Sequence, residues 1–227
     1  MANLTMQRKV EKTARILKNL YGEPKPWIAD TPLDCLIAVI LSQNTSDKNS
    51  FPAFANLKKL FPTWEQVIVA DEKKIANAIQ RGGLANIKAK RIKSVLAEIK
   101  QKTGKLDISF LSQVPTEQAR EFLTSLNGVG PKSAAVVLSF AFNKPTFPVD
   151  THVFRVTRRL GLHEEKTPEK AQKLESLVPD KLKQSYHLNL IRLGREVCIS
   201  RKPRCGECPL NNNCNYYKTV FKKQKSA

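Results

Sequence analysis

Apolar residues recur at every third or fourth position along most of the chain, with charged residues between them. This spacing is typical of amphipathic helices, and no segment alternates apolar and polar residues as a half-buried strand does. Thr31 followed by Pro32 is the pattern of a helix start, and glycine or proline turns separate the periodic segments. We therefore predict an all-α protein with helices at residues 5–20, 32–43, 47–60, 64–69, 72–80, 87–102, 116–126, 132–142, 151–160, 167–176 and 183–197.

The composition is that of a basic, folded protein. The chain has 227 residues, 41% of them apolar, and 39 Lys and Arg against 20 Asp and Glu give a formal net charge of +19. These values exclude a disordered chain and a disulfide-stapled miniprotein, and the length predicts one or two domains. The positive charge favours a polyanionic partner, most simply nucleic acid, although a solvated basic surface would have the same composition.

The sequence also bears on where the protein acts. No apolar run approaches ~20 residues, so neither a membrane-spanning helix nor a membrane partner is expected. No apolar segment follows Met1, so no secretory signal is expected. We therefore expect a cytoplasmic protein associated with the nucleoid, or a nuclear one if the source is eukaryotic.

Four of the five cysteines form a candidate ligand set. Cys35 stands alone in an apolar stretch and is expected to be a buried hydrophobic residue. The others have the spacing C-x6-C-x2-C-x5-C, which suits zinc or an iron–sulfur cluster in a reducing compartment. Zinc sites usually have two closely spaced pairs, so the single pair here favours [4Fe–4S]. The four candidate ligands are Cys198, Cys205, Cys208 and Cys214.

Two further features carry candidate chemistry. The glycine-rich stretch from Leu126 to Ala135 predicts a tight hairpin between two helices, whose exposed amides could hold a phosphate; an ordinary helical corner is the alternative. Lys132 falls in the first turn of the second helix, where a cation is unfavourable and a neutral, nucleophilic amine is favoured. A phosphate-contacting or solvated lysine is equally compatible with the sequence. Asp150 is a helix N-cap, a carboxylate that stabilises developing positive charge, or both.

Cations surround these features. Arg201, Lys202 and Arg204 lie inside the cysteine loop, which is interpreted equally as a contact to DNA phosphates or as a structural staple. Arg155, Arg158 and Arg159 are interpreted as a solvated or phosphate-facing surface of the helix that follows Asp150.

These residues together resemble the endonuclease III branch of the helix-hairpin-helix DNA glycosylases. The hairpin at 126–134, the Val149–His152 element and the cysteine loop occur in the family's order and spacing, from about residue 10 to 217. The resemblance implies two helical domains with a DNA-binding cleft between them: a six-helix barrel and an iron–sulfur cluster domain. The implied domains are 26–135 for the barrel, with the helix-hairpin-helix at about 116–142, and 1–25 with 136–217 for the cluster domain, followed by a basic tail at 218–227.

The resemblance also implies an activity. It predicts a base-excision repair enzyme that acts on double-stranded DNA containing damaged bases or abasic sites. The sequence does not give the oligomeric state, and we take a monomer as the simplest expectation. Lys132 falls on the nucleophile that marks bifunctional glycosylase/AP lyases, Asp150 on the essential aspartate, and the four cysteines on the [4Fe–4S] ligands. Oxidised pyrimidines are the family's usual substrates. A monofunctional mismatch or modified-base glycosylase and a non-catalytic DNA-binding module are the alternatives.

Three loop residues complete the implied DNA interface, together with Gly128 and Gly130 of the hairpin. Leu84 matches a residue that wedges into the duplex, although a packing leucine would have the same pattern. Either Gln43 or Asn44 would fill the space left by the extruded base, unless this polar segment merely ends a helix. The region from 89 to 132 is longer than in short bacterial enzymes and is similar to plant 5-methylcytosine glycosylases, so the preferred base is open.

Overall fold

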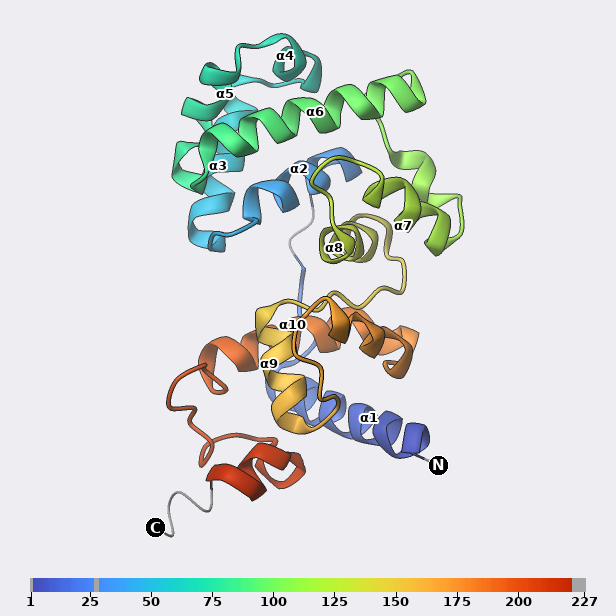
Figure 1. The fold of residues 1–227 in the computed structure, drawn as a ribbon, viewed down its shortest axis with the longest axis vertical. Helices are drawn as coiled ribbons and strands as arrows, with labels where there is room; N and C mark the ends of the chain where they lie inside the picture. The colour runs from blue at the N-terminus through green and yellow to red at the C-terminus, as the bar shows by residue number, and fades with distance from the viewer. Residues whose placement is uncertain (1, 27–28, 222–227) are drawn as a thin grey trace. The chain divides into compact units, whose positions relative to one another are not determined.

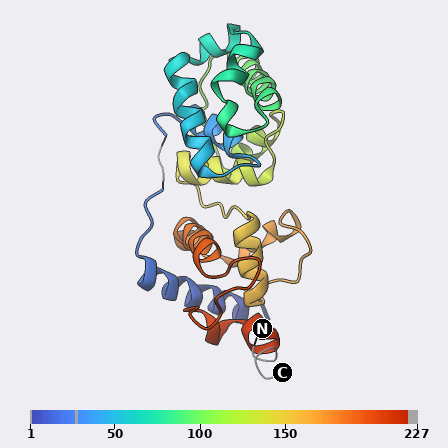
Figure 2. The same ribbon diagram turned by 90° about the vertical axis from the view of Figure 1, so that its left-hand side faces the viewer.

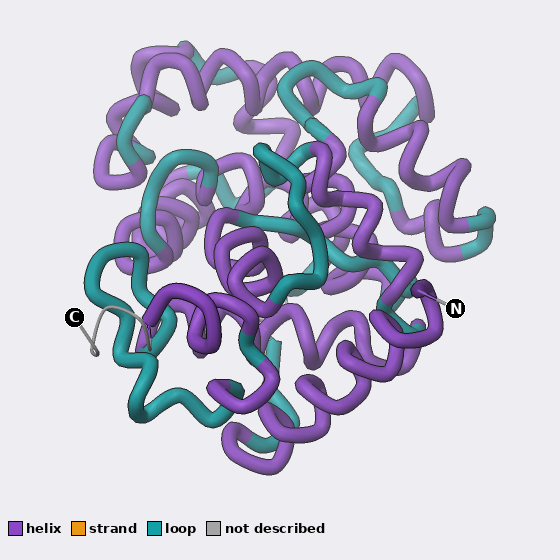
Figure 3. Tube along the Cα trace, turned by 60° about the horizontal axis from the view of Figure 1, so that its bottom comes forward, coloured by secondary structure: helices purple, strands orange, loops and turns teal. Residues whose placement is uncertain are grey.

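A computed structural model describes residues 2–26 and 29–221, and it confirms the all-α prediction. Helices joined by loops make up this part of the chain, in which no strand occurs (Figures 1 and 3). None of the described helices has the length and apolar content that crossing a membrane requires. The α-helices are α1 (Ala2–Tyr21), α2 (Pro32–Ser42), α3 (Asp47–Leu60), α4 (Trp64–Val69), α5 (Glu72–Ala78), α6 (Ala85–Thr103), α7 (Thr116–Thr124), α8 (Pro131–Phe142), α9 (Thr151–Leu160) and α10 (Lys183–Glu196). Short 3-10 helices are η1 (Gln80–Gly82), η2 (Ser109–Ser112), η3 (Lys170–Leu177), η4 (Asp180–Leu182) and η5 (Asn211–Asn213), and a π-helical turn, η6, covers Tyr217–Phe221.

The chain divides into two compact units. One comprises Trp27–Lys144, and the other combines Met1–Pro26 with Pro145–Ala227. The boundary predicted after residue 135 is wrong, because it would cut α8 in its second turn. Val137 and Leu138, which lie beyond that point, are fully buried in the core of the middle unit. The division therefore falls in the loop after α8.

The middle unit is built around α2. Thr31 caps this helix by accepting a hydrogen bond from the Asp34 amide at 3.1 Å, and Pro32 occupies its first position. Every residue from Leu33 to Leu41 is buried, because α3, α6 and α8 all pack against the helix (Figure 2). A short helix that is apolar on all sides is stable only inside such a shell. The polar residues from Ser42 onward leave the core. Because they directly follow a buried helix, the packing of that helix fixes where they emerge.

The other unit packs α1 against α10, and α10 against α9. An extended segment at 146–149 runs through its core, and all of its residues are buried. The α-helix predicted at 167–176 is instead the 3-10 helix η3. Two of its residues spaced by three, Ala171 and Leu174, are buried, and a 3-10 helix aligns positions i and i+3 on one side. Gln172 and Glu175, which are also spaced by three, accept hydrogen bonds from backbone amides of the extended segment.

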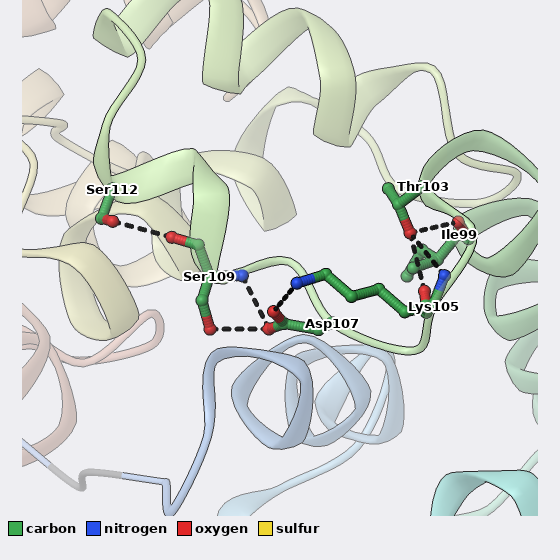
Figure 4. Close-up of polar contacts among 6 residues, drawn as sticks. All are labelled: Ile99, Thr103, Lys105, Asp107, Ser109 and Ser112. Atoms are coloured by element: carbon green, nitrogen blue, oxygen red, sulfur yellow. Dashed lines mark hydrogen bonds and ion pairs between the residues drawn. The ribbon is translucent and has the colours of Figure 1, made fainter.

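The connection between α6 and α7 is ordered by local contacts (Figure 4). Gly104 ends α6 with a φ of +76°. The Asp107 carboxylate accepts hydrogen bonds from the Ser109 amide at 2.8 Å and its hydroxyl at 2.6 Å, and it pairs with Lys105 at 3.2 Å. These bonds from Ser109, followed by the ion pair, lower the pKa of Asp107. The connection between α6 and α7 is thus an ordered turn, which leads into the two helices of the hairpin.

Candidate functional site

The predicted hairpin lies between α7 and α8. The Val129 amide donates to the Leu126 carbonyl at 3.1 Å, and Gly128 has a φ of +78°, a conformation that L-amino acids with a side chain rarely adopt. Gly130 is the extended N-cap of α8. The amides of Gly128 and Gly130 make no hydrogen bond within the described part of the chain. The turn therefore presents two unpaired N–H donors, which suits an anion.

Lys132 is the second residue of α8, immediately beyond this hairpin. Its side chain is exposed, and its ammonium makes no hydrogen bond or ion pair with any residue that the structure describes. The flanking Ser133 is buried. A rigid, packed helix start thus displays one free amine beside two free amides, a geometry that suits attack on a DNA sugar whose phosphate the amides hold.

Gln43 and Asn44 lie side by side in sequence but differ in their surroundings. The Gln43 side-chain amide donates to the Gly128 carbonyl at 3.2 Å and to the Ser133 hydroxyl at 3.1 Å. Its oxygen accepts a 2.5 Å hydrogen bond from Arg91. Asn44 is exposed and has a left-handed φ of +54°. The structure therefore engages Gln43 with the hairpin and leaves Asn44 facing solvent.

Leu84 occupies an unusual conformation before α6. Its φ is +51° and its side chain is 51% exposed, although a left-handed residue with a side chain costs roughly 1–2 kcal/mol. Lys88 holds this loop by donating to the Gly82 carbonyl at 2.8 Å and to the Leu41 carbonyl of α2 at 2.7 Å. Lys88 is only 1% exposed, and burial, followed by the charge of Arg91, lowers its pKa. The buried Lys88 thus supports the loop in which Leu84 has a strained backbone and an exposed apolar side chain.

Asp150 belongs to the other unit, where it is the N-cap of α9. Its Oδ1 accepts a 2.7 Å hydrogen bond from the Val153 amide, and within the described residues its Oδ2 makes none. The preceding segment is fixed at each residue: Phe147 and Val149 bond Glu175 and Gln172, and the Pro148 carbonyl lies 2.8 Å from a His187 ring nitrogen. Asp150 is therefore both a capping residue and a rigidly placed carboxylate with one oxygen available.

The four cysteines of the loop line one cavity. It contains about 280 Å³ of empty space that is partly open to solvent, and its other lining residues include Arg159 and Tyr216. No three Cys, His, Asp or Glu side chains of the described residues converge as ligands of a single ion would. A cavity shared by Cys198, Cys205, Cys208 and Cys214 suits a polynuclear cluster.

The electrostatics of the cysteines agree with this ligand set. Burial raises the pKa of Cys208 to about 11. Burial, followed by repulsion from Cys198 and Cys214, also raises the pKa of Cys205. Thiolates that line one cavity repel one another, and the iron ions of a cluster would supply the positive charge that offsets this repulsion.

Two arginines of α9 bind the cysteine loop, so the prediction that they form a solvated or phosphate-facing surface is wrong for them. Arg155 donates to the Cys198 carbonyl at 2.9 Å. Arg159 donates to the Ile199 and Ser200 carbonyls at 2.7 and 2.9 Å and lies 3.3 Å from the Cys198 sulfur. The backbone carbonyls of the cysteine loop have few partners in regular secondary structure. The two arginines point toward the loop because they supply the donors that these carbonyls need.

The predicted DNA contacts of the loop are exposed cations. Arg201 and Lys202 are exposed, and Lys202 has a φ of +50°. Arg204 also braces the loop, because it donates to the Glu196 carbonyl and pairs with Glu207 at 3.8 Å. Sequence reasoning found these residues but missed Lys88 and Arg91, whose partners are distant in the sequence.

Comparisons with known proteins agree with this geometry. A model of the HhH-GPD superfamily of base excision DNA repair proteins matches residues 37–180. A model of the iron-sulfur binding domain of endonuclease III matches residues 198–214, which begin and end at a predicted cysteine ligand.

Individual relatives match over much of the chain. Endonuclease III of Thermotoga maritima is 32% identical over 210 residues, which are 92% of this chain and 93% of the relative. A protein of Arabidopsis thaliana that is named as a candidate DNA glycosylase is 39% identical over 179 residues, which are 76% of this chain but 59% of that relative. The chain thus spans about three fifths of the length of the plant relative.

Solved structures give the same result. Two complexes of endonuclease III with DNA, one non-covalent and one a trapped covalent intermediate, align with a TM-score of 0.82 and 27% identity over 95% of this chain and 98% of theirs. The fold, the iron–sulfur loop and the superfamily predicted from the sequence are therefore confirmed. The chain belongs to the endonuclease III family of the HhH-GPD superfamily, as an iron–sulfur DNA glycosylase of base-excision repair with abasic-site (AP) lyase activity.

Proposed function

We propose that Lys132 is the nucleophile of this activity. Its neutral Nζ attacks C1′ of the deoxyribose while the glycosidic bond breaks, and the base leaves after gaining a proton. The nitrogen then gives up one proton, the C1′–O4′ bond breaks as O4′ takes up a proton, and a protonated Schiff base forms at C1′. Removal of a C2′ proton then breaks the C3′–O bond by β-elimination, and water releases the lysine from the sugar. The free, exposed amine beside the hairpin is the observation that supports this role.

Asp150 is proposed to stabilise the positive charge that develops on the sugar and to assist proton transfer. Its Oδ1 is committed to the Val153 amide, which fixes the side chain while the other oxygen stays available. A carboxylate that is already oriented requires little reorganisation as charge develops.

The DNA contacts are proposed from exposure and conformation. Leu84 wedges into the duplex, and Asn44, whose side chain is exposed, enters the space left by the extruded base. The amides of Gly128 and Gly130 hold a phosphate. When bound, the [4Fe–4S] cluster crosslinks the loop, which then presents Arg201, Lys202 and Arg204 to the DNA backbone.

The substrate is proposed to be an oxidised pyrimidine or an abasic site in double-stranded DNA, bound by a monomer. The support for a DNA partner is the net charge of +19 and the likeness to two endonuclease III–DNA complexes. The protein is proposed to act in the cytoplasm on the nucleoid, or in the nucleus of a eukaryotic source.

Borohydride trapping tests the mechanism. The cluster-loaded protein is incubated with a duplex that carries an abasic site or an oxidised pyrimidine, then reduced, with Lys132→Ala and Lys90→Ala beside it. We expect a covalent adduct from wild type and from Lys90→Ala and none from Lys132→Ala. DNA binding without an adduct from wild type would refute the Schiff base and leave a monofunctional glycosylase or a DNA-binding module.

A further inference from the structure

The side chain of Arg91 on α6 packs directly against Gly128 of the hairpin. A Cβ added to Gly128 would stand 2.2 Å from Arg91 Nε and 2.4 Å from Cδ, so any other residue would displace the arginine from its present place. The position thus requires glycine for two independent reasons, a left-handed φ and contact with an arginine. Such close packing indicates that the arginine is part of the hairpin's construction.

Gln43 joins this arginine to both ends of the hairpin. It accepts from Arg91 and donates to the Gly128 carbonyl and to the Ser133 hydroxyl. Both donors and the acceptor of one carboxamide are therefore used, which fixes the orientation of its oxygen and nitrogen. Because Ser133 directly follows Lys132, a shift of Gln43 moves the helix turn that carries the amine.

A carboxylate of α6 fixes the same hairpin at its start. Glu98 accepts a 3.1 Å hydrogen bond from the Asn127 amide, and its other oxygen is held by Ser94 at 2.8 Å. Arg91 and Glu98 are seven residues apart and share one face of α6. Glu98 therefore holds one side of Gly128, and the pair of Arg91 and Gln43 holds the other.

We propose that Arg91 and Gln43 form a bracket that sets the position of Lys132 by fixing the hairpin. They are positioning residues, since Arg91 acts on the hairpin through Gln43 and by contact with Gly128. The proposal rests on the proposed role of Lys132 and goes beyond it by naming what places the amine. A misplacement of about 1 Å can lower a rate roughly 100-fold, so the bracket is expected to govern rate more than affinity.

A double-mutant cycle tests the bracket. Arg91→Ala, Gln43→Ala and the double variant are compared with Lys90→Ala, which removes the same charge from an exposed position of α6. Single-turnover rates of borohydride-trapped adduct formation are measured at saturating protein on an abasic-site duplex, and the dissociation constant is measured against salt. Thermal melting shows which variants are folded. Arg91→Lys keeps the charge without the fork of donors and serves as the milder variant.

The bracket predicts a specific pattern. Each single variant, Arg91→Lys included, lowers the adduct rate by roughly 10- to 100-fold, and the double variant is no slower than the slower single one. The affinity of the Arg91 and Gln43 variants for the duplex, and its salt dependence, should match those of Lys90→Ala. A salt slope lowered by about one relative to Lys90→Ala, with an unchanged saturated rate, would make Arg91 a phosphate contact instead and overturn the proposal. Additive rate losses would also overturn it. Failure of wild type to form an adduct would refute the role of Lys132 itself, whereas normal wild-type trapping with unaffected variants refutes the bracket alone.

Discussion

The buried Lys88 should be among the most sensitive positions of the middle unit. Lys88→Met keeps most of the side-chain volume but removes the donor to the Leu41 and Gly82 carbonyls, which lie 2.7 and 2.8 Å away. Leu41 lies in the last turn of α2, where a carbonyl has no partner within the helix. The substitution therefore leaves two acceptors without their donor at a site where the lysine is 1% exposed.

The magnitude follows from these two acceptors. A buried acceptor that loses its partner costs about 1–3 kcal/mol, and methionine avoids the cost of burying an amine. We expect a net loss of about 2–4 kcal/mol, which at roughly 4 °C per kcal/mol lowers Tm by about 8–16 °C. Thermal unfolding followed by circular dichroism measures this, with the exposed Lys90→Met as the matched control on the same helix.

The same substitution should affect one step of the reaction more than the other. Without Lys88, the Gly82 carbonyl is released and the strained Leu84 loses its support. Leu84 is proposed to wedge into the duplex when a damaged base is extruded, whereas cleavage at an existing abasic site has no base to extrude. Well below Tm, Lys88→Met should therefore lose more of its glycosylase rate than of its lyase rate. If Lys88→Met melts within about 2 °C of Lys90→Met or loses both rates equally, the reasoning is refuted.

Three further predictions concern the hairpin and the cysteines. The new Cβ of Gly128→Ala would meet Arg91 at 2.2 Å in a backbone with a φ of +78°, whereas that of Gly104→Ala, at a φ of +76°, meets nothing within 4 Å. Chemical denaturation should show that Gly104→Ala lowers the free energy of unfolding by about 1 kcal/mol, with DNA affinity unchanged. Gly128→Ala should lower the free energy of unfolding further and weaken DNA binding. An equal loss of unfolding free energy in the two variants would contradict the close packing of Arg91 on Gly128. Cys205→Ser should abolish the visible absorbance of the cluster, while Cys35→Ser retains it. Burial raises the pKa of Cys35 to about 12, so this thiol should resist alkylation at neutral pH in the folded protein; rapid labelling would contradict its burial.

The sequence predicts local structure and spacing better than it predicts partners. The helix starts at Pro32 and Pro131 follow from cap and proline signals that act over four residues. The cysteine loop follows from spacing alone. By contrast, Lys88 belongs to a run of basic residues in a helix, and its acceptor at Leu41 is 47 residues away. Nothing local separates it from an exposed lysine, because burial is decided by the tertiary packing of α2 against α6.

One helix face explains why the proposed DNA contacts of the middle unit can act together. Lys88, Arg91 and Glu98 recur at helical spacing on α6, and each fixes a different segment. Lys88 joins the Leu84 loop to the end of α2, Arg91 joins the end of α2 to the hairpin, and Glu98 holds the start of the hairpin. The proposed wedge at Leu84, the proposed gap-filling residue Asn44 and the turn that carries Lys132 lie far apart in the sequence. Because a helix is stiff over this length, its side chains set the spacing of all three, and substitutions at 88 and 91 should each disturb a different pair.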